Sequence, residues 1–211
     1  MANYFSIFPK ILYSFDDYKN SEYITNILSR FSFEESLKNN FSAYFMYTIK
    51  DDETPEIIAS KYYDSPNKHW IILMMNDIID PQFDWPLTYS SLDSYIDVKY
   101  MEMANSNTSG AGIDWSKSNN IAYYMTEKTI TPDNIITINQ YEIDANTYAN
   151  TTYSSSNLTL ENGDIITIEI DKTYKTYYDY EIEQNDSKRE IKLLKREFLV
   201  PIENEIRKVF E

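Results

Sequence analysis

The stretch from Tyr47 to Pro81 constrains the fold more than any other part of the sequence. Tyr47 and Ile49 alternate with polar neighbours, as they do in a short strand. Thr54-Pro55 and Ser65-Pro66 each place a hydroxyl N-cap before a proline at the first helical position. Residues 70–75, WIILMM, are apolar on every side of a helix, which indicates burial. The stretch therefore predicts a strand and two short helices, the second of which lies in a core.

Apolar segments flank this stretch at both ends of the chain. Residues 1–20 are apolar without a sustained period around Pro9, which predicts an arm that buries against its own domain or a neighbouring subunit. Residues 21–31 have helical apolar spacing and predict a short amphipathic helix. Residues 201–210 repeat the same spacing, so a C-terminal amphipathic helix is expected, packed on its own domain or docked on a partner.

The second half of the sequence is typical of β-structure. Residues 105–112, NSNTSGAG, contain two of the three glycines and predict a mobile loop or linker. Alternating apolar residues predict a strand around Ile136 and a hairpin turning at Asn162-Gly163, with a polar loop tip before it. A second hairpin is expected to turn at Asn185-Asp186. The fold class is therefore α+β, with a hairpin-rich C-terminal half.

Composition excludes several classes of function. The formal net charge is −15, so the surface repels phosphate backbones and we expect no nucleic-acid partner. Cysteine is absent, which excludes thiol catalysis, disulfides and Cys-ligated zinc, and fits a reducing compartment. The longest apolar run is far shorter than the ~20 residues that cross a bilayer, and the first residues do not form a secretory signal, so we expect neither membrane partner nor leader.

The sequence contains no arrangement that predicts catalysis, a cofactor or a metal. His69 is the single histidine, and its position beside Trp70 predicts packing or hydrogen bonding. Asp77, Asp80 and Asp84 follow the second helix and could hold a hard cation, but aspartates at such places also cap turns. We therefore expect no enzyme, no cofactor and no metal site.

The 20 tyrosines and 10 phenylalanines suit either large contact surfaces or a β-rich core, and the sequence leaves both open. Apolar residues without an obvious internal partner are the candidates for a partner interface. They are Phe5, Phe8, Tyr13, Trp85, Ile206 and Phe210.

Four stretches carry a resemblance to a known family. They are YFSIFPKILYSF (4–15), ILSRFSFEESLKNN (27–40), residues 47–87 ending in HWIILMMNDIIDPQFDWPL, and YEIEQNDSKREIKLLK (180–195). Together they resemble the small baseplate wedge proteins of contractile-tailed bacteriophages, and the third stretch resembles a LysM-type β-α-α-β unit. Two departures stand out: Lys50–Pro55 replaces a turn that usually holds a glycine, and residues 101–175 have no counterpart.

The resemblance implies a structural subunit of the virion tail baseplate, assembled in the cytoplasm of the bacterial host. Its implied role is to bind larger wedge proteins and to clamp neighbouring wedges into a six-fold ring, with hub or sheath-initiating proteins as further partners. The expected domains are 1–42 (arm and helix), 43–100 (LysM-like), 101–175 (β-rich insertion with flexible loops) and 176–211 (hairpin and C-terminal helix). The alternative is a LysM-type peptidoglycan-binding module, with Asp52, Thr54 and the surroundings of Ile79 as its groove.

Overall fold

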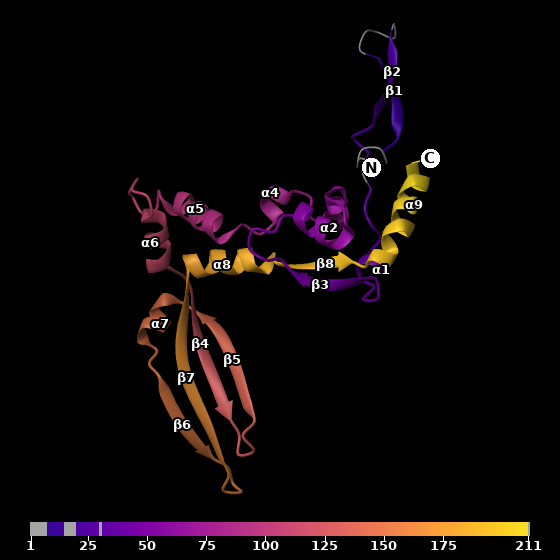
Figure 1. Cartoon of the computed structure of the whole chain (residues 1–211). Coiled ribbons are helices and arrows are strands. Elements are labelled where there is room, and N and C mark those ends of the chain that lie inside the picture. Colours follow the sequence, from indigo (N-terminus) through magenta and orange to yellow (C-terminus); the bar gives the residue numbers. More distant parts are fainter. Residues whose placement is uncertain (1–7, 15–19, 30, 211) are drawn as a thin grey trace. The chain divides into compact units, whose positions relative to one another are not determined.

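A computed structural model describes residues 8–14, 20–29 and 31–210 of the chain (Figure 1). The chain divides into two compact units. Residues up to Thr88 and from Asp186 onward form the first unit, and residues 89–185 form the second. The second unit is thus inserted in sequence into the first. Both units mix helices and strands, which confirms the α+β class.

The first unit contains eleven elements among its described residues. They are β1 (Lys10–Ser14), β2 (Ser21–Thr25), α1 (Glu35–Lys38), β3 (Tyr44–Thr48), α2 (Pro55–Tyr63), η2 (Pro66–Lys68), α3 (His69–Met75), α4 (Pro81–Asp84), β8 (Glu190–Leu194), η3 (Arg196–Phe198) and α9 (Leu199–Phe210). The helix starts agree with the sequence: the Thr54 hydroxyl accepts a hydrogen bond from Ile57 N, and Pro55 and Pro66 open their helices.

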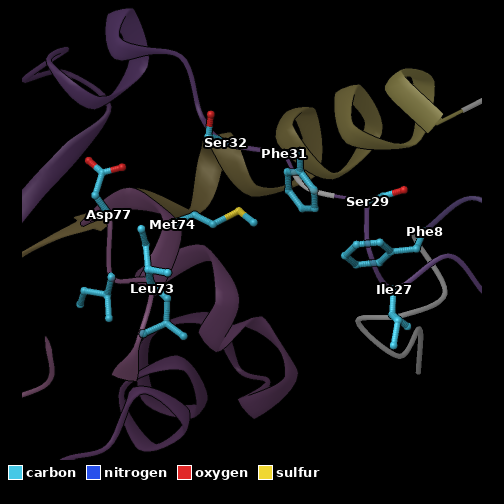
Figure 2. Close-up of a pocket in the computed structure, with 10 residues that line it drawn as sticks. Phe8, Ile27, Ser29, Phe31, Ser32, Leu73, Met74 and Asp77 are labelled. Carbon is cyan, nitrogen blue, oxygen red and sulfur yellow. The ribbon is translucent and has the colours of Figure 1, made fainter. Parts of the chain in front are cut away.

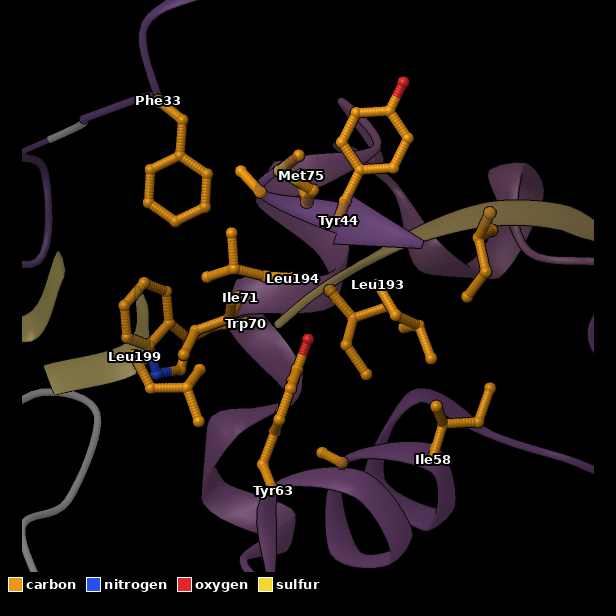
Figure 3. Packing of buried hydrophobic residues seen from close by; sticks show 14 of the residues in the cluster. Phe33, Tyr44, Ile58, Tyr63, Trp70, Ile71, Met75, Leu193, Leu194 and Leu199 are labelled. Atoms are coloured by element: carbon orange, nitrogen blue, oxygen red, sulfur yellow. The ribbon is translucent and has the colours of Figure 1, made fainter. Parts of the chain in front are cut away.

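A two-stranded antiparallel sheet and the helices α2 and α3 enclose the core of the first unit (Figure 3). Tyr44 of β3 pairs with Leu194 of β8, 150 positions further along the chain. The most deeply buried apolar side chains come from α2, α3 and β8: Ile58, Ile71, Ile72, Met75, Leu193 and Leu194. The element order is therefore β-α-α-β, as expected, but the closing strand comes from residues 190–194 rather than from within 43–100. The likeness of this unit to a LysM module stays a prediction.

One amide side chain fastens α3 to the closing strand. Asn76 Nδ2 donates to the carbonyls of Ile72 and Lys192, and Asn76 Oδ1 accepts a hydrogen bond from Lys192 N at 2.7 Å. An asparagine supplies both donors and acceptors, so one side chain can satisfy both backbone groups of Lys192 on the outer edge of β8. Asn76 thus ends α3 and satisfies the backbone N–H and carbonyl groups of Lys192 on that edge of β8.

The hairpin predicted around Asn185-Asp186 is wrong. Residues 177–187 form the helix α8 (Tyr177–Ser187), and β8 pairs with β3 instead of with the preceding residues. The apolar residues at 178, 180 and 182 suggested a period of two. The buried positions of α8 are Glu181 and Asn185, spaced by four, and a carboxylate and an amide give no hydrophobic signal.

The helix predicted over residues 21–31 is also wrong. Residues 21–25 form β2, which pairs with β1 in an antiparallel hairpin that joins Leu12 to Tyr23. The spacing of apolar residues within 21–31 fits a helix, but it takes no account of a partner strand. The segment 10–14 supplies that partner and changes the outcome.

The second unit consists of a helical part and a four-stranded antiparallel sheet. Its elements are α5 (Tyr89–Tyr100), α6 (Ala111–Ser118), β4 (Asn120–Ile130), β5 (Ile136–Ile143), α7 (Ala145–Asn150), β6 (Ser154–Thr159), β7 (Ile165–Thr176) and most of α8. The strand order is β5-β4-β7-β6 (Figure 1). The turn at Asn162-Gly163 is confirmed, with Gly163 at φ +89°. Residues 145–159 form α7 and β6 in place of the expected polar loop tip.

Aromatic rings and a carboxylate hold the helical part of the second unit together. The Tyr100 ring stacks on Trp115 at 5.6 Å, and both rings contact Tyr177. Glu181 Oε1 accepts hydrogen bonds at 2.7 Å from Lys99 Nζ and from the Tyr100 hydroxyl. These contacts tie α5, α6 and α8 into one small core.

Residues 105–112, which are predicted as a mobile loop or linker, lead into the first turn of α6, and hydrogen bonds hold that turn in place. The Asp97 carboxylate accepts hydrogen bonds from the backbone N–H groups of Gly110 and Gly112, which hold the pKa of Asp97 below its usual range. A Cβ atom at Gly112 would lie 2.1 Å from the Asp97 carbonyl oxygen. Glycine is therefore required where α6 approaches α5.

Candidate interaction surface

An apolar groove opens on the first unit, between the segment that follows β2 and the end of α3 (Figure 2). Its volume is about 620 Å³. Its lining is mostly apolar and comprises Phe8, Ile27, Ser29, Phe31, Ser32, Leu73, Met74, Asp77, Ile78 and Ile79. Figure 2 shows Phe8, Ile27 and Phe31 on one side, and Leu73 and Met74 on the other.

A run of aromatic contacts positions the N-terminal side of the groove. The Phe8 ring lies 6.0 Å from Phe31, and Phe31 lies edge-on to Trp70 at 5.9 Å. Trp70 in turn contacts Phe33 within the core. Such offset and edge-on pairs are the favoured aromatic geometries, so Phe8 is anchored to α3 through Phe31.

The rim of the groove leaves large apolar side chains in solvent. Ile27 is 68% exposed and Ile79 is 88% exposed, and Leu28 beside the groove is 83% exposed. A folded protein commonly exposes single apolar residues, but a hollow lined and rimmed by them is typical of a docking site. The groove therefore offers a receptor for an apolar side chain or helix of another protein.

The groove has one charged lining residue, Asp77, which forms an ion pair with Lys38. Lys38, which is almost fully buried, binds Asp77 and also Glu35. The hydrogen bond to Asp77 is the main reason that the pKa of Lys38 lies above its ordinary value, and it outweighs the opposing effect of burial. Because Asp77 is already neutralised by this lysine, the groove has little net charge.

The hairpin β1–β2 adds a second apolar surface to the first unit. Ile11, Leu12, Tyr13 and Tyr23 are between 39% and 73% exposed. An isolated two-stranded hairpin is marginally stable in water, so burial of these side chains on another surface would stabilise it.

The structure places the predicted contact residues in different surroundings. Phe8 is buried against Phe31 in the groove, and Tyr13 is 46% exposed on β1. Trp85 and Ile206 lie in the core of the first unit, and Trp85 Nε1 donates to the carbonyl of Glu53 at 2.9 Å. Phe5 and the side chain of Phe210 lie outside the described residues. A partner role for these six residues stays a prediction.

Sequence reasoning found the exposed rim only in part. The apolar spacing of residues 21–31 places Ile27 and Leu28 in an amphipathic helix, and the surroundings of Ile79 are expected only as part of a peptidoglycan-binding groove. The available signal was local: in both places two consecutive large apolar residues stand in a segment rich in Asn and Asp, where a turn is expected to be polar.

The residues considered for chemistry have structural roles. His69 Nδ1 lies 3.0 Å from the carbonyl oxygen of Pro66, so Nδ1 carries the proton and donates, which confirms the hydrogen-bonding prediction. Asp80 caps α4 by accepting from Gln82 N, and Asp84 accepts from Asp80 N. Among the described residues, three or more His, Cys, Asp or Glu side chains nowhere gather in a way that could bind a metal ion. None of the described helices combines the length and apolarity needed to cross a membrane.

A hydrogen-bonded cluster fixes the turn between β3 and α2. Glu53 Oε2 accepts hydrogen bonds from the Tyr47 hydroxyl at 2.6 Å and from Lys50 N at 3.0 Å, and Lys61 lies within ion-pair distance. Burial acts to raise the pKa of Glu53, but these donors outweigh it and lower that pKa. Burial and the bond to Glu53 raise the pKa of Tyr47 to about 12. The cluster replaces the glycine turn that the family resemblance implies.

A comparison with known protein families shows which family the chain belongs to. The family model described as Base plate wedge protein 53 matches residues 3–209. The chain belongs to this family. It is therefore a structural protein of a phage tail baseplate, and the resemblance of the sequence to baseplate wedge proteins is confirmed.

A relative gives the same assignment over a shorter stretch. Baseplate wedge protein gp53 of Enterobacteria phage T4 is 32% identical over 56 residues, which is 26% of this chain and 29% of that protein. The match thus spans less than a third of the T4 protein.

Proposed function

We propose that this wedge protein binds larger wedge proteins through the groove and the β1–β2 hairpin, and that it clamps neighbouring wedges together. The observation that carries the proposal is the apolar groove whose rim residues Ile27 and Ile79 stand in solvent. A clamp needs two surfaces that bury apolar area on neighbours, and the groove and the hairpin provide two in one unit. The site of action is the virion tail baseplate, after assembly in the host cytoplasm.

Co-expression with the other wedge proteins of the same phage tests the proposal. The full chain is expected to co-migrate with them in size-exclusion chromatography. Ile27→Asp and Ile79→Asp place a charge in the groove, and each should weaken the complex at least about tenfold, because burying a charge without a partner is unfavourable.

Ile57→Asp is the matched control. Ile57 is 49% exposed on α2 and does not line the groove, so this variant should assemble like the unmodified chain. All three variants should keep the thermal unfolding midpoint close to that of the unmodified protein. Equal losses of assembly in all three, or failure of the unmodified chain to co-migrate, would contradict the proposal.

A further inference from the structure

The sheet of the second unit lacks a core of its own. The structure describes all of residues 120–175, and none of their apolar side chains is buried. Helices α6 and α7 contact one end of this sheet. α6 contacts β7, and the Tyr148 ring of α7 contacts Tyr123 and Tyr174, near the start of β4 and the end of β7. A β-sheet normally covers an apolar face with a second layer. The part of this sheet beyond α7 has none.

That uncovered part is apolar on both faces. We define the distal half of the sheet as residues 128–138 and 156–168, which include both hairpin turns at one end of the sheet (Figure 1). The tetrapeptide Ile-Ile-Thr-Ile occurs twice there, at 135–138 and 165–168. Because successive side chains of a strand alternate between faces, a pair of isoleucines places one apolar side chain on each face.

The strand register assigns these residues to faces. Leu158, Ile166 and Ile168 share one face, since Leu158 pairs with Ile166. Ile130, Ile136 and Ile138 share the other, since Ile130 pairs with Ile136. Ile136, Ile138 and Leu158 are between 54% and 63% exposed. Strands with apolar residues on both faces are typical of sheets that are buried on both sides.

The charge of the second unit indicates what kind of molecule can cover these faces. Residues 89–185 contain 5 lysines, no arginine and 15 carboxylates, which gives a net charge of −10. Three of the lysines pair with carboxylates of the same unit: Lys99 with Glu181, Lys128 with Glu169 and Lys175 with Glu183. Lys117 lies over the Tyr178 ring, and Lys172 donates to the Tyr148 carbonyl. The cations are thus used internally, and an excess of carboxylates faces solvent.

The two hairpin turns concentrate this excess. Asp133 lies in the turn between β4 and β5, and Glu161 and Asp164 lie in the turn between β6 and β7. Neither turn contains a lysine or an arginine. The apolar faces therefore end in an acidic tip.

We propose that the distal half of the sheet inserts into an apolar cleft with a basic rim on a different protein. Contact with both faces requires a cleft, or two neighbouring surfaces, rather than a single flat patch. A second copy of this unit would bring another net charge of −10 and is disfavoured by repulsion. The same repulsion acts against nucleic acid and anionic lipid.

Paired substitutions on one strand test the apolar contact. Ile138→Glu in the full chain, co-expressed with the other wedge proteins of the same phage, should weaken binding at least about tenfold. Gln140→Glu is the matched control, because Gln140 lies two positions along on the same strand and face but outside the distal half. Leu158→Glu and its control Ser154→Glu test the other face in the same way.

Neutral variants test the acidic tip. Asp133→Asn with Glu161→Gln should weaken binding and reduce its dependence on salt concentration, since two charge contacts are removed. Glu102→Gln with Asp114→Asn removes the same number of charges from the helical part of the unit. This control should leave the binding affinity and its dependence on salt concentration unchanged. Thermal unfolding of each variant checks that the fold is kept.

This inference rests on the proposed function in one respect: both assume that the protein binds other wedge proteins. The two proposals concern different surfaces. If Ile138→Glu and Leu158→Glu bind as their controls do, while Ile27→Asp loses binding, the inference fails and the proposed function stands. If the unmodified chain binds no wedge protein, both fail. Concentration-dependent self-association that Ile138→Glu abolishes, or binding to vesicles of phosphatidylglycerol, would identify another occupant and overturn the inference.

Discussion

The core of the first unit and the sheet of the second unit show two ways in which similar residues can be used. In the first unit, isoleucines and leucines of α2, α3 and β8 are fully buried in one cluster. In the sheet, isoleucines at comparable density along β5 and β7 remain in solvent or half-buried. The difference is the second layer, because helices cover the β3–β8 pair, whereas α6 and α7 contact the four-stranded sheet only near the start of β4 and the end of β7. The first unit therefore contains an apolar core of its own, and the four-stranded sheet does not.

The largest contrast is expected from truncating one apolar side chain in each region. Leu193→Ala removes a side chain that is fully buried on β8 and should lower the free energy of unfolding by about 2–5 kcal/mol. The Ile138 side chain is 63% exposed, so Ile138→Ala should change the free energy of unfolding by less than about 0.5 kcal/mol. Urea denaturation of the full chain measures both, and similar losses would contradict the contrast between the two regions.

An intermediate effect is expected where the second unit does have a packed interior. Gly112→Ala brings a Cβ atom against the backbone of α5 and should destabilise the pair α5–α6 by about 1–3 kcal/mol. Hydrogen exchange of the α5 and α6 amides should detect the loss locally.

Gly163→Ala serves as the control for that variant. A Cβ atom there meets nothing within 4 Å, so the cost is only that of a left-handed conformation, about 1 kcal/mol, and it should be confined to the β6–β7 turn. Faster exchange throughout α5 and α6 in Gly163→Ala would mean that the helical part depends on the sheet.

The smallest effect concerns pH and the first unit alone. The pKa of Glu53 is lowered in the folded protein, so its stabilising contribution is present above the ordinary pKa of a glutamate and is lost as pH falls through the folded value. Glu53→Gln should therefore flatten the acid limb of stability of the first unit below about pH 4.3. Glu56→Gln, on the exposed side of α2, should leave that limb unchanged in thermal unfolding scans.

Local signals in the sequence predicted the parts of the fold that depend on neighbouring residues. The capped start of α2, the proline that opens η2, the buried run in α3, the turn at Asn162-Gly163 and the C-terminal helix α9 all follow from such signals, although the Ser65 side chain does not form the expected cap. The pairing of strands that are distant in sequence could not be predicted from local signals. Nothing near residues 190–194 indicates that their partner is β3, and nothing near residues 21–25 indicates β1.

The residues of the interaction surface could also be predicted only in part from local sequence. Apolarity identified Phe8 as a candidate, and Phe8 does line the groove. Apolarity also selected Trp85 and Ile206, whose partners come from segments distant in sequence and only become visible in the folded core. Exposure of Ile27 and Ile79 is likewise a property of the three-dimensional structure, because their apolarity alone predicts burial.

The pairing of β3 with β8 also bears on how the protein is made. Tyr44 is synthesised well before its partner Leu194, which lies 150 positions further along the chain. Residues 89–185 are continuous in sequence, so the inserted unit is complete before the ribosome has delivered the strand that closes the first unit. The apolar helices α2 and α3 therefore stay incompletely covered until residues 190–194 have been synthesised.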